Sequence, residues 1–135
     1  MIDKEIIKNV VKVCWDYLNL SIPVDMEQII LQYEMNEIEK LHEYNDYKVN
    51  NYNLAMQLGD ILLHDGYIDN YYTSSKRRLE NQFFASYLLV PESKLMKYLE
   101  DNCTLIDEAT LECLSNYFIV PKMAINKIGK EYKLW

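Results

Sequence analysis

The sequence predicts an α+β fold that is mainly helical, with roughly five or six helices and two or three short strands near residues 35–52. Apolar residues repeat at a spacing of three and four through most of the chain, and residues 35–39 alternate as a strand does. A chain of 135 residues, 50% of them hydrophobic, can bury one core, so residues 1–135 are expected to form a single domain.

The first half of the chain predicts two helices followed by poor strand signals. The stripe expected to be buried in the first helix, residues 5–19, consists of Ile6, Val10, Val13, Tyr17 and Leu18. Asp25 is in position to cap a second helix that runs to about residue 33. Residues 42–53 are rich in Asn, Asp and Tyr and predict a loop or a weak edge strand.

The second half of the chain predicts a run of helices. Residues 54–64 predict a helix that ends near Asp65 and Gly66. Its apolar residues form one stripe, so we expect it to be the central buried helix; they are Leu54, Ala55, Leu58, Ile61 and Leu62. A helix over 74–89 stacks Phe84 with its apolar neighbours and ends at Pro91, because proline restrains the residue before it. Further helices are expected from Pro91, over 107–117 and over 121–130.

Composition and charge exclude several classes of protein. Fourteen basic and 21 acidic residues give a formal charge of −7, which opposes sequence-independent binding to nucleic acid, although an acidic surface can imitate nucleic acid. No run approaches the roughly 18 to 20 apolar residues that cross a bilayer, and the N-terminus lacks a secretory signal. A cytoplasmic protein is therefore expected. Cys14, Cys103 and Cys113 form no CxxC pair and are expected to be reduced, mostly buried thiols.

Four stretches resemble, in order, the ImmA/IrrE family of zinc metallopeptidases. Residues 21–30, SIPVDMEQII, are similar to an early helix start, and residues 54–64, LAMQLGDILLH, to the helix that carries HExxH. Residues 80–91, ENQFFASYLLVP, are similar to the second helix, which supplies a carboxylate and ends in a Leu-Leu-x-Pro turn. Residues 114–125 are similar to the closing stretch. The resemblance implies a zincin-like fold, reduced here because the segment before residue 54 is short.

The zinc motif is degenerate in this chain. Met56 and Asp60 stand where the family has its two zinc-binding histidines, and Gln57 stands where it has the glutamate that acts as general base. Methionine is a poor zinc ligand and glutamine cannot accept a proton. Glu80 corresponds to the downstream carboxylate, while Gly59 also matches and suits close helix packing. These positions are therefore expected to be vestigial, with no catalytic residue and no cofactor.

Other constellations offer alternatives. Asp60, His64 and Glu80 are a candidate replacement metal site, because residues four apart share a helix face, although a polar cluster is the simpler interpretation. His42 and Glu43, with Asp46, imitate HExxD but lie in the polar segment, where an ordinary exposed surface is expected.

Nucleophile and phosphate chemistry have little support. A cysteine nucleophile needs a histidine close by, and the chain has only two histidines. Its three glycines are scattered, which excludes a Walker loop or a GxGxxG motif. Lys76-Arg77-Arg78, the basic cluster at the start of a predicted helix, is expected to be a solvated face, with a partner-docking spot as the alternative.

The resemblance and the degenerate motif together predict a pseudoenzyme that binds a protein. The family implies a setting in phages and mobile elements within a bacterial cell, where the partner is a helix-turn-helix repressor or a host defence protein. The expected role is that of an antirepressor or an inhibitor of a host system. The alternatives are an active peptidase with a non-standard metal site and an acidic inhibitor that imitates nucleic acid.

Overall fold

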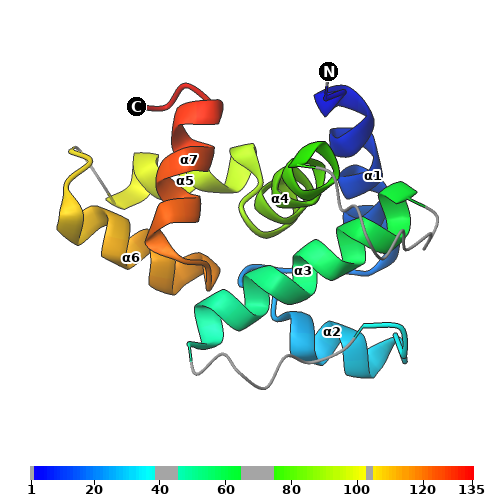
Figure 1. Ribbon diagram of the computed structural model, residues 1–135. Coiled ribbons are helices and arrows are strands. Elements are labelled where there is room, and N and C mark those ends of the chain that lie inside the picture. The colour runs from blue at the N-terminus through cyan, green and yellow to red at the C-terminus, as the bar shows by residue number, and fades with distance from the viewer. Residues whose placement is uncertain (1, 39–45, 65–74, 103–104) are drawn as a thin grey trace.

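The computed structural model describes residues 2–38, 46–64, 75–102 and 105–135, and these ranges contain seven helices and no strand. The helices are α1 (Lys4–Tyr17), α2 (Met26–Gln32), α3 (Tyr47–His64), α4 (Ser75–Leu89), α5 (Glu92–Asn102), α6 (Glu108–Phe118) and α7 (Lys122–Glu131) (Figure 1). The prediction of a mainly helical fold is confirmed. None of the helices in the described ranges combines the length and the hydropathy that crossing a bilayer requires.

Aspartates cap three of the helices. The side chain of Asp3 accepts a hydrogen bond from the Ile6 amide, that of Asp25 from the first turn of α2, and that of Asp107 from the Thr110 amide. Each carboxylate satisfies N–H groups that the helix itself leaves unpaired, and its charge suits the positive end of the helix dipole. The cap predicted at Asp25 is confirmed.

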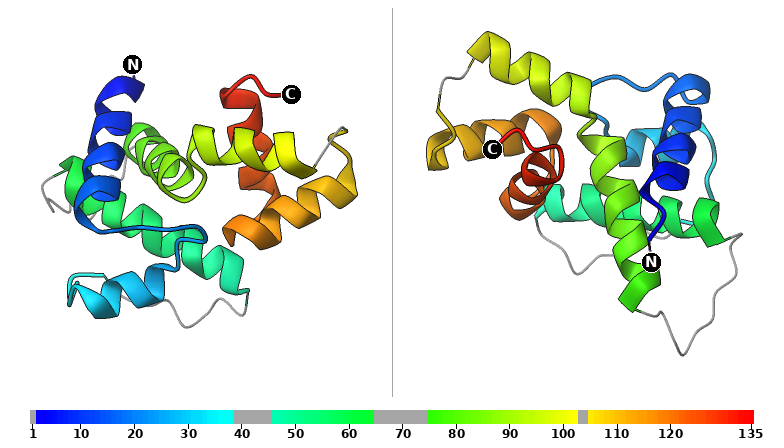
Figure 2. Two further views of the ribbon diagram at one scale, coloured as in Figure 1. Left: turned by 180° about the vertical axis from the view of Figure 1, so that it is seen from behind. Right: turned by 90° about the horizontal axis from the view of Figure 1, so that it is seen from above.

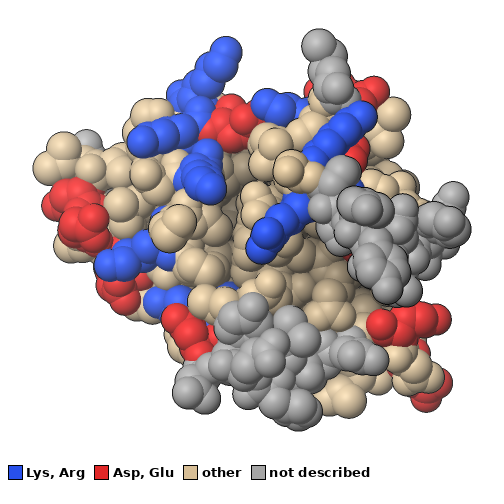
Figure 3. All heavy atoms as spheres, in the orientation of Figure 1, with Lys and Arg blue, Asp and Glu red and all other residues tan. Residues whose placement is uncertain are grey.

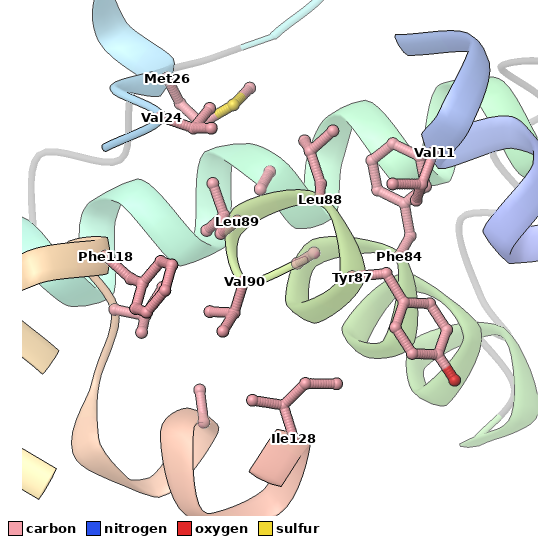
Figure 4. Packing of buried hydrophobic residues seen from close by; sticks show 14 of the residues in the cluster. Val11, Val24, Met26, Phe84, Tyr87, Leu88, Leu89, Val90, Phe118 and Ile128 are labelled. Atoms are coloured by element: carbon pink, nitrogen blue, oxygen red, sulfur yellow. The ribbon is translucent and has the colours of Figure 1, made fainter. Parts of the chain in front are cut away.

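Helix α4 lies at the centre of the molecule. It packs most extensively against α3 and then against α1, while α2 contacts α3, and α6 pairs with α7 (Figures 1 and 2). Side chains from these helices meet in one core, in which Phe84, Leu88 and Leu89 of α4 are fully buried (Figure 4). This arrangement holds the second half of α3, which carries Met56, Gln57 and Asp60, against the start of α4.

The predicted small sheet is wrong in the part of the chain that the structure describes. Residues 35–38 form turns in which the Met35 amide donates to the Ile30 carbonyl and the Ile38 amide to the Met35 carbonyl, so local bonds replace strand pairing. Residues 47–53 belong to α3 rather than to a loop or edge strand. The reason is tertiary: asparagine disfavours an isolated helix, but Asn51 is buried at 5% exposure and bonds to three backbone groups of other segments.

The predicted buried face of the first helix is wrong at three of its five residues, whereas Val10 and Leu18 are half-buried against the core. Ile6 is 57% exposed, Val13 53% and Tyr17 79%, whereas the neighbouring stripe of Ile7, Val11 and Cys14 is buried. Both stripes have helical spacing, and the choice between them depends on which side of the helix meets α4. The predicted end of the central helix near residues 65–66 lies outside the described residues.

Gly59 marks the closest approach of α3 and α4. A Cβ atom built on Gly59 would lie 2.6 Å from Cδ1, 2.8 Å from Cγ and 2.9 Å from Cβ of Phe84. Phe84 has no exposed surface and cannot turn away, so only a residue without a side chain fits. The close-packing role expected for Gly59 is confirmed.

We expect Gly59→Ala to lower the free energy of unfolding by about 1 to 3 kcal/mol, because overpacking outweighs the gain in helix propensity. Chemical denaturation followed by circular dichroism measures the change. The cost should shrink in a Phe84→Ala background, because that change removes two of the three nearest atoms. Equal costs in the two backgrounds would contradict the packing described.

Candidate functional site

The three degenerate motif positions lie on the second half of α3. Met56, Gln57 and Asp60 are all half-buried. Met56 packs against the margin of the hydrophobic core, which is the ordinary role of a methionine side chain. Asp60 turns towards α4 and makes polar contacts with side chains of that helix.

Asp60 is held by two side chains of α4. Nε of Arg77 donates to Oδ1 of Asp60 at 2.6 Å and Nη2 of Arg77 donates to Oδ2 at 2.9 Å, a two-pronged ion pair. Nδ2 of Asn81 also donates to Oδ1 at 2.9 Å. The Arg77 side chain is 13% exposed and that of Asp60 28% exposed, so the pair is shielded from water on most sides. Paired geometry of this kind is among the stronger charge-assisted interactions.

These contacts keep Asp60 ionised. Partial burial acts to raise the pKa of the Asp60 carboxyl, but hydrogen bonds from Arg77 and Asn81 and the charge of Arg77 outweigh burial. The pKa therefore lies below its ordinary value. The carboxylate is negative at neutral pH, and its charge is already balanced by a guanidinium.

The zinc that the family resemblance implies does not fit this set of residues. Met56 offers a thioether and Gln57 an amide, neither of which binds Zn²⁺ well in water. Both oxygens of the Asp60 carboxylate already accept hydrogen bonds from Arg77, so a metal would have to displace a cation. Asp60 therefore belongs to an ion pair, and the three residues do not supply the ligands that a zinc ion prefers.

The alternative metal ligands do not converge either. Within the described ranges no group of three or more His, Cys, Asp and Glu side chains is placed to hold a metal ion, so Asp60, His64 and Glu80 form no such cluster. Glu80 is half-buried on α4, and His64 is the last residue of α3, close enough for its charge to act on Asp60. No hydrogen bond or ion pair joins His64 to Asp60 among the described residues, and Nε2 of His64 is buried there without a hydrogen-bond partner.

Of the other candidate residues, several have ordinary roles. Asp46 directly precedes α3, and its side chain accepts a hydrogen bond from the Lys48 amide, while His42 and Glu43 lie outside the described residues. Cys14 is buried and burial raises its pKa to about 11, so it is a poor nucleophile. Cys113 is exposed, and Cys103 lies outside the described residues.

The basic cluster is divided between two roles. Lys76 and Arg78 are exposed, as a solvated face requires, but Arg77 turns inward to Asp60. Sequence reasoning missed Arg77 and Asn81 as members of the site. The available signal was the unfavourable position of Arg77 at a helix start, which calls for a carboxylate nearby.

A groove opens where α3, α4 and α7 meet. It has a volume of about 570 Å³, which is within the range of small-ligand sites, and its walls include Tyr52 of α3, Phe83 of α4 and Met123 of α7. Met123 is 72% exposed and Leu79, which also lines the groove, is 42% exposed. On the face shown in Figure 3, Lys and Arg side chains lie over the upper and left parts of the surface, with Asp and Glu side chains beside them and uncharged residues between. Sequence reasoning did not predict this groove.

The Asp60–Arg77 pair predicts a pH-dependent contribution to stability. Because the folded pKa of Asp60 is lowered, the contribution is full above the ordinary aspartate pKa of about 3.9 and is lost as the pH falls through the lowered value. We expect Asp60→Asn to cost about 1 to 3 kcal/mol at neutral pH and progressively less below about pH 4. Urea denaturation across this range measures the difference.

The matched control is Asp16→Asn, since Asp16 is exposed on α1 and belongs to no ion pair among the described residues. It should change stability little at any pH. A cost of Asp60→Asn that does not depend on pH would show that the carboxylate charge is not what stabilises the helix pair.

Comparison with known proteins identifies the family. Residues 40–127, more than half of the chain, match a family model. That family is described as the IrrE N-terminal-like domain of peptidase family M78. No curated protein and no solved structure matches the chain. The matched range contains α3, which carries Met56, Gln57 and Asp60, and α4. The chain therefore belongs to the ImmA/IrrE family of proteins with an IrrE N-terminal-like domain.

Proposed function

We propose that this chain is a catalytically inactive member of its metallopeptidase-like family and acts by binding another protein. The observation that carries the proposal is the ion pair of Asp60 with Arg77, reinforced by Asn81, at the position of the second metal-binding histidine. A catalytic zinc site needs three protein ligands and an open position for water. In this chain the guanidinium of Arg77 supplies the positive charge beside α3 that a zinc ion would supply in an active enzyme.

Water activation also lacks a base. In the family the glutamate between the two histidines takes the proton, and Gln57 at this position has no group that can accept one at neutral pH. The chain therefore keeps the helix pair that carries the catalytic groups in its relatives and has replaced those groups. A helix pair that is kept without its catalytic groups is consistent with a role in binding another protein.

We propose the groove between α3, α4 and α7 as the contact surface. Exposed apolar side chains gathered in a concave surface are typical of protein interaction sites, and Met123 and Leu79 provide them here. The partner we propose is a repressor or defence protein of the bacterial host, bound stoichiometrically in the cytoplasm, so that the chain acts as a phage or mobile-element regulator.

Capture experiments with a surface variant test this proposal. Tagged protein and its Met123→Glu variant are incubated with a lysate of the source organism, and captured proteins are identified by mass spectrometry. Met123 is exposed, so the charge should leave the fold intact and abolish capture of the specific partner. The matched control is Leu31→Glu, because Leu31 is 78% exposed on α2 and does not line the groove.

The response to salt separates an apolar contact from imitation of nucleic acid. Binding through the groove should persist at raised ionic strength, whereas binding through the acidic surface should weaken, since salt screens charge-driven contacts. Capture that is lost with Leu31→Glu, or that is indifferent to Met123→Glu, would contradict the proposed surface. Absence of any stoichiometric protein partner would contradict the proposed function.

A further inference from the structure

The groove between α3, α4 and α7 has two walls with the spacing of helix faces. The residues that line it from α4 are Leu79, Gln82, Phe83 and Ser86. Those that line it from α7 include Ala124, Lys127, Ile128 and Glu131. Both sets follow the pattern i, i+3, i+4 and i+7, which is one helix face over two turns, or about 10 Å along each helix. Figure 2 shows α4 and α7 side by side in the view from above.

The hydroxyl groups that line the groove are already paired. The hydroxyl of Tyr52 donates to the Gln82 carbonyl at 3.1 Å and lies 2.9 Å from Oγ of Ser86. Exposed apolar surface lies beside them, since Met123 is 72% exposed and Leu79 42%. Apolar side chains of a partner can therefore cover the groove without leaving these hydroxyl groups unpaired.

Exposed lysines stand along both walls of the groove. Lys127 lines the groove from α7, and Lys130 lies seven residues after Met123, on the same side of that helix. On α4, Lys76 lies three residues before Leu79 and so shares its face. None of the three lysines belongs to an ion pair among the described residues.

The carboxylate beside the groove is already balanced by a cation. Among the described residues that line the groove, Glu131 carries the carboxylate, and its two oxygens accept from Nζ of Lys4 at 2.6 and 3.2 Å. The same amino group lies 4.9 Å from the ring centroid of Phe83. The margin of the groove is thus positive in a chain of net charge −7. A surface that complements it is apolar at its centre and acidic at its margins.

We propose that the groove receives an amphipathic helix of the partner protein, with apolar residues at i, i+3, i+4 and i+7 and acidic residues on both flanks. This inference rests on the proposed function, because it names the part of the partner that the proposed contact surface binds. A helix laid between α4 and α7 places its apolar side chains against both walls over their two turns. The apolar contacts supply most of the affinity, and the lysines orient the helix.

The charge of the groove also restricts which helix of a DNA-binding partner fits. A helix that reads DNA presents basic side chains to the phosphate backbone. The lysines along the groove repel such a helix, so the groove selects an acidic helix from another part of the partner.

Selection from a random peptide library tests the inference. Displayed peptides long enough for about four helical turns are selected on the full chain, and those that also bind the Met123→Glu variant are removed. We expect the remaining peptides to carry aliphatic or aromatic residues at i, i+3, i+4 and i+7, with Asp or Glu on the flanks. The control variant is Leu31→Glu, which should bind the same peptides, because Leu31 is exposed on α2 and does not line the groove.

Reversal of charge tests the acidic flanks. A selected peptide is labelled with a dye, and its affinity is measured by fluorescence anisotropy. Lys127→Glu should weaken binding about fivefold or more, and a peptide whose acidic flanks are replaced by lysine should bind this variant better than it binds the native chain. Lys12→Glu is the matched control, since Lys12 is exposed on α1 outside the groove, and it should leave the affinity unchanged. Circular dichroism checks that both variants are folded.

The outcomes separate this inference from the proposed function. Capture of a partner from the lysate that depends on Met123, combined with selected peptides that lack helical spacing or carry basic flanks, would overturn the inference and leave the proposed function standing. Failure to select any peptide that depends on Met123 would also overturn the inference, as would an affinity that Lys127→Glu leaves unchanged. Selection of acidic helical peptides without capture of any partner would support the inferred preference of the groove and contradict the proposed function.

Discussion

Replacing Phe84 with alanine is expected to lower the free energy of unfolding by about 3 to 5 kcal/mol, which is the usual range for a fully buried phenylalanine. Phe84 has no exposed surface, and its ring lies against Gly59 at the closest approach of α3 and α4. Glycine at position 59 offers no side chain that could move into the space left by the ring. Equilibrium denaturation with urea, followed by circular dichroism, measures the loss.

Phe83→Ala is the matched control for Phe84. Phe83 is the neighbouring residue on the same helix, half-buried at the wall of the groove, with the amino group of Lys4 lying 4.9 Å from its ring centroid. Its replacement removes the same atoms but leaves a space that water can fill, so we expect a loss of about 1 to 2 kcal/mol. Equal losses for the two variants would mean that the core face of α4 is misplaced.

Asn51→Ala is expected to cost about 3 to 5 kcal/mol, because one buried side chain satisfies three backbone groups. Its Oδ1 accepts from the Met26 amide at 2.8 Å, and its Nδ2 donates to the carbonyls of Val24 and Ile119, each at 2.9 Å. Asn51 thereby ties the start of α2 and the turn after α6 to α3. Alanine leaves all three groups without a partner in a site that is closed to water.

Asn53→Ala controls for the removal of an asparagine from the same helix. The Asn53 side chain is half-buried and, among the described residues, donates to the Val49 carbonyl one turn earlier. Since alanine favours helix more than asparagine does, this variant should be within about 0.5 kcal/mol of the wild type. The same denaturation experiment applies to both variants. Similar small effects for Asn51 and Asn53 would contradict the bridging role of Asn51.

Helical periodicity was a good guide to where the helices lie, but a poor guide to their partners. The stretches around Leu54, Phe84 and Leu95 are helical as predicted and these three residues are buried, although Leu62, Leu79 and Met96 on the same helices are exposed. In α1 two apolar stripes compete, and only packing on α4 decides that Ile7 is buried and Ile6 exposed. Residues 47–53 look like a loop by composition because the bonds that make Asn51 favourable in a helix come from distant parts of the chain.

The candidate site shows the same division between local and distant information. Spacing was enough to place Met56, Gln57 and Asp60 on one helix, and the resemblance to the family led to the prediction that they stand in place of the zinc motif. That Arg77 and Asn81 reach Asp60 depends on the register of α4 against α3, which Gly59 and Phe84 set by contact. The register of two packed helices cannot be predicted from a single sequence. The ion pair of Asp60 with Arg77 could therefore be identified only from the structure.

The zinc content of the purified chain tests the central claim most directly. Tag-free protein is supplemented with zinc, dialysed and analysed by elemental analysis, beside a variant carrying Met56→His, Gln57→Glu and Asp60→His. We predict less than stoichiometric zinc in the native chain and retained zinc in the triple variant, whose histidines can bind metal one helical turn apart. Stoichiometric zinc in the native chain that is lost with Asp60→Asn would contradict the account, because it would make Asp60 a metal ligand and not the partner of Arg77.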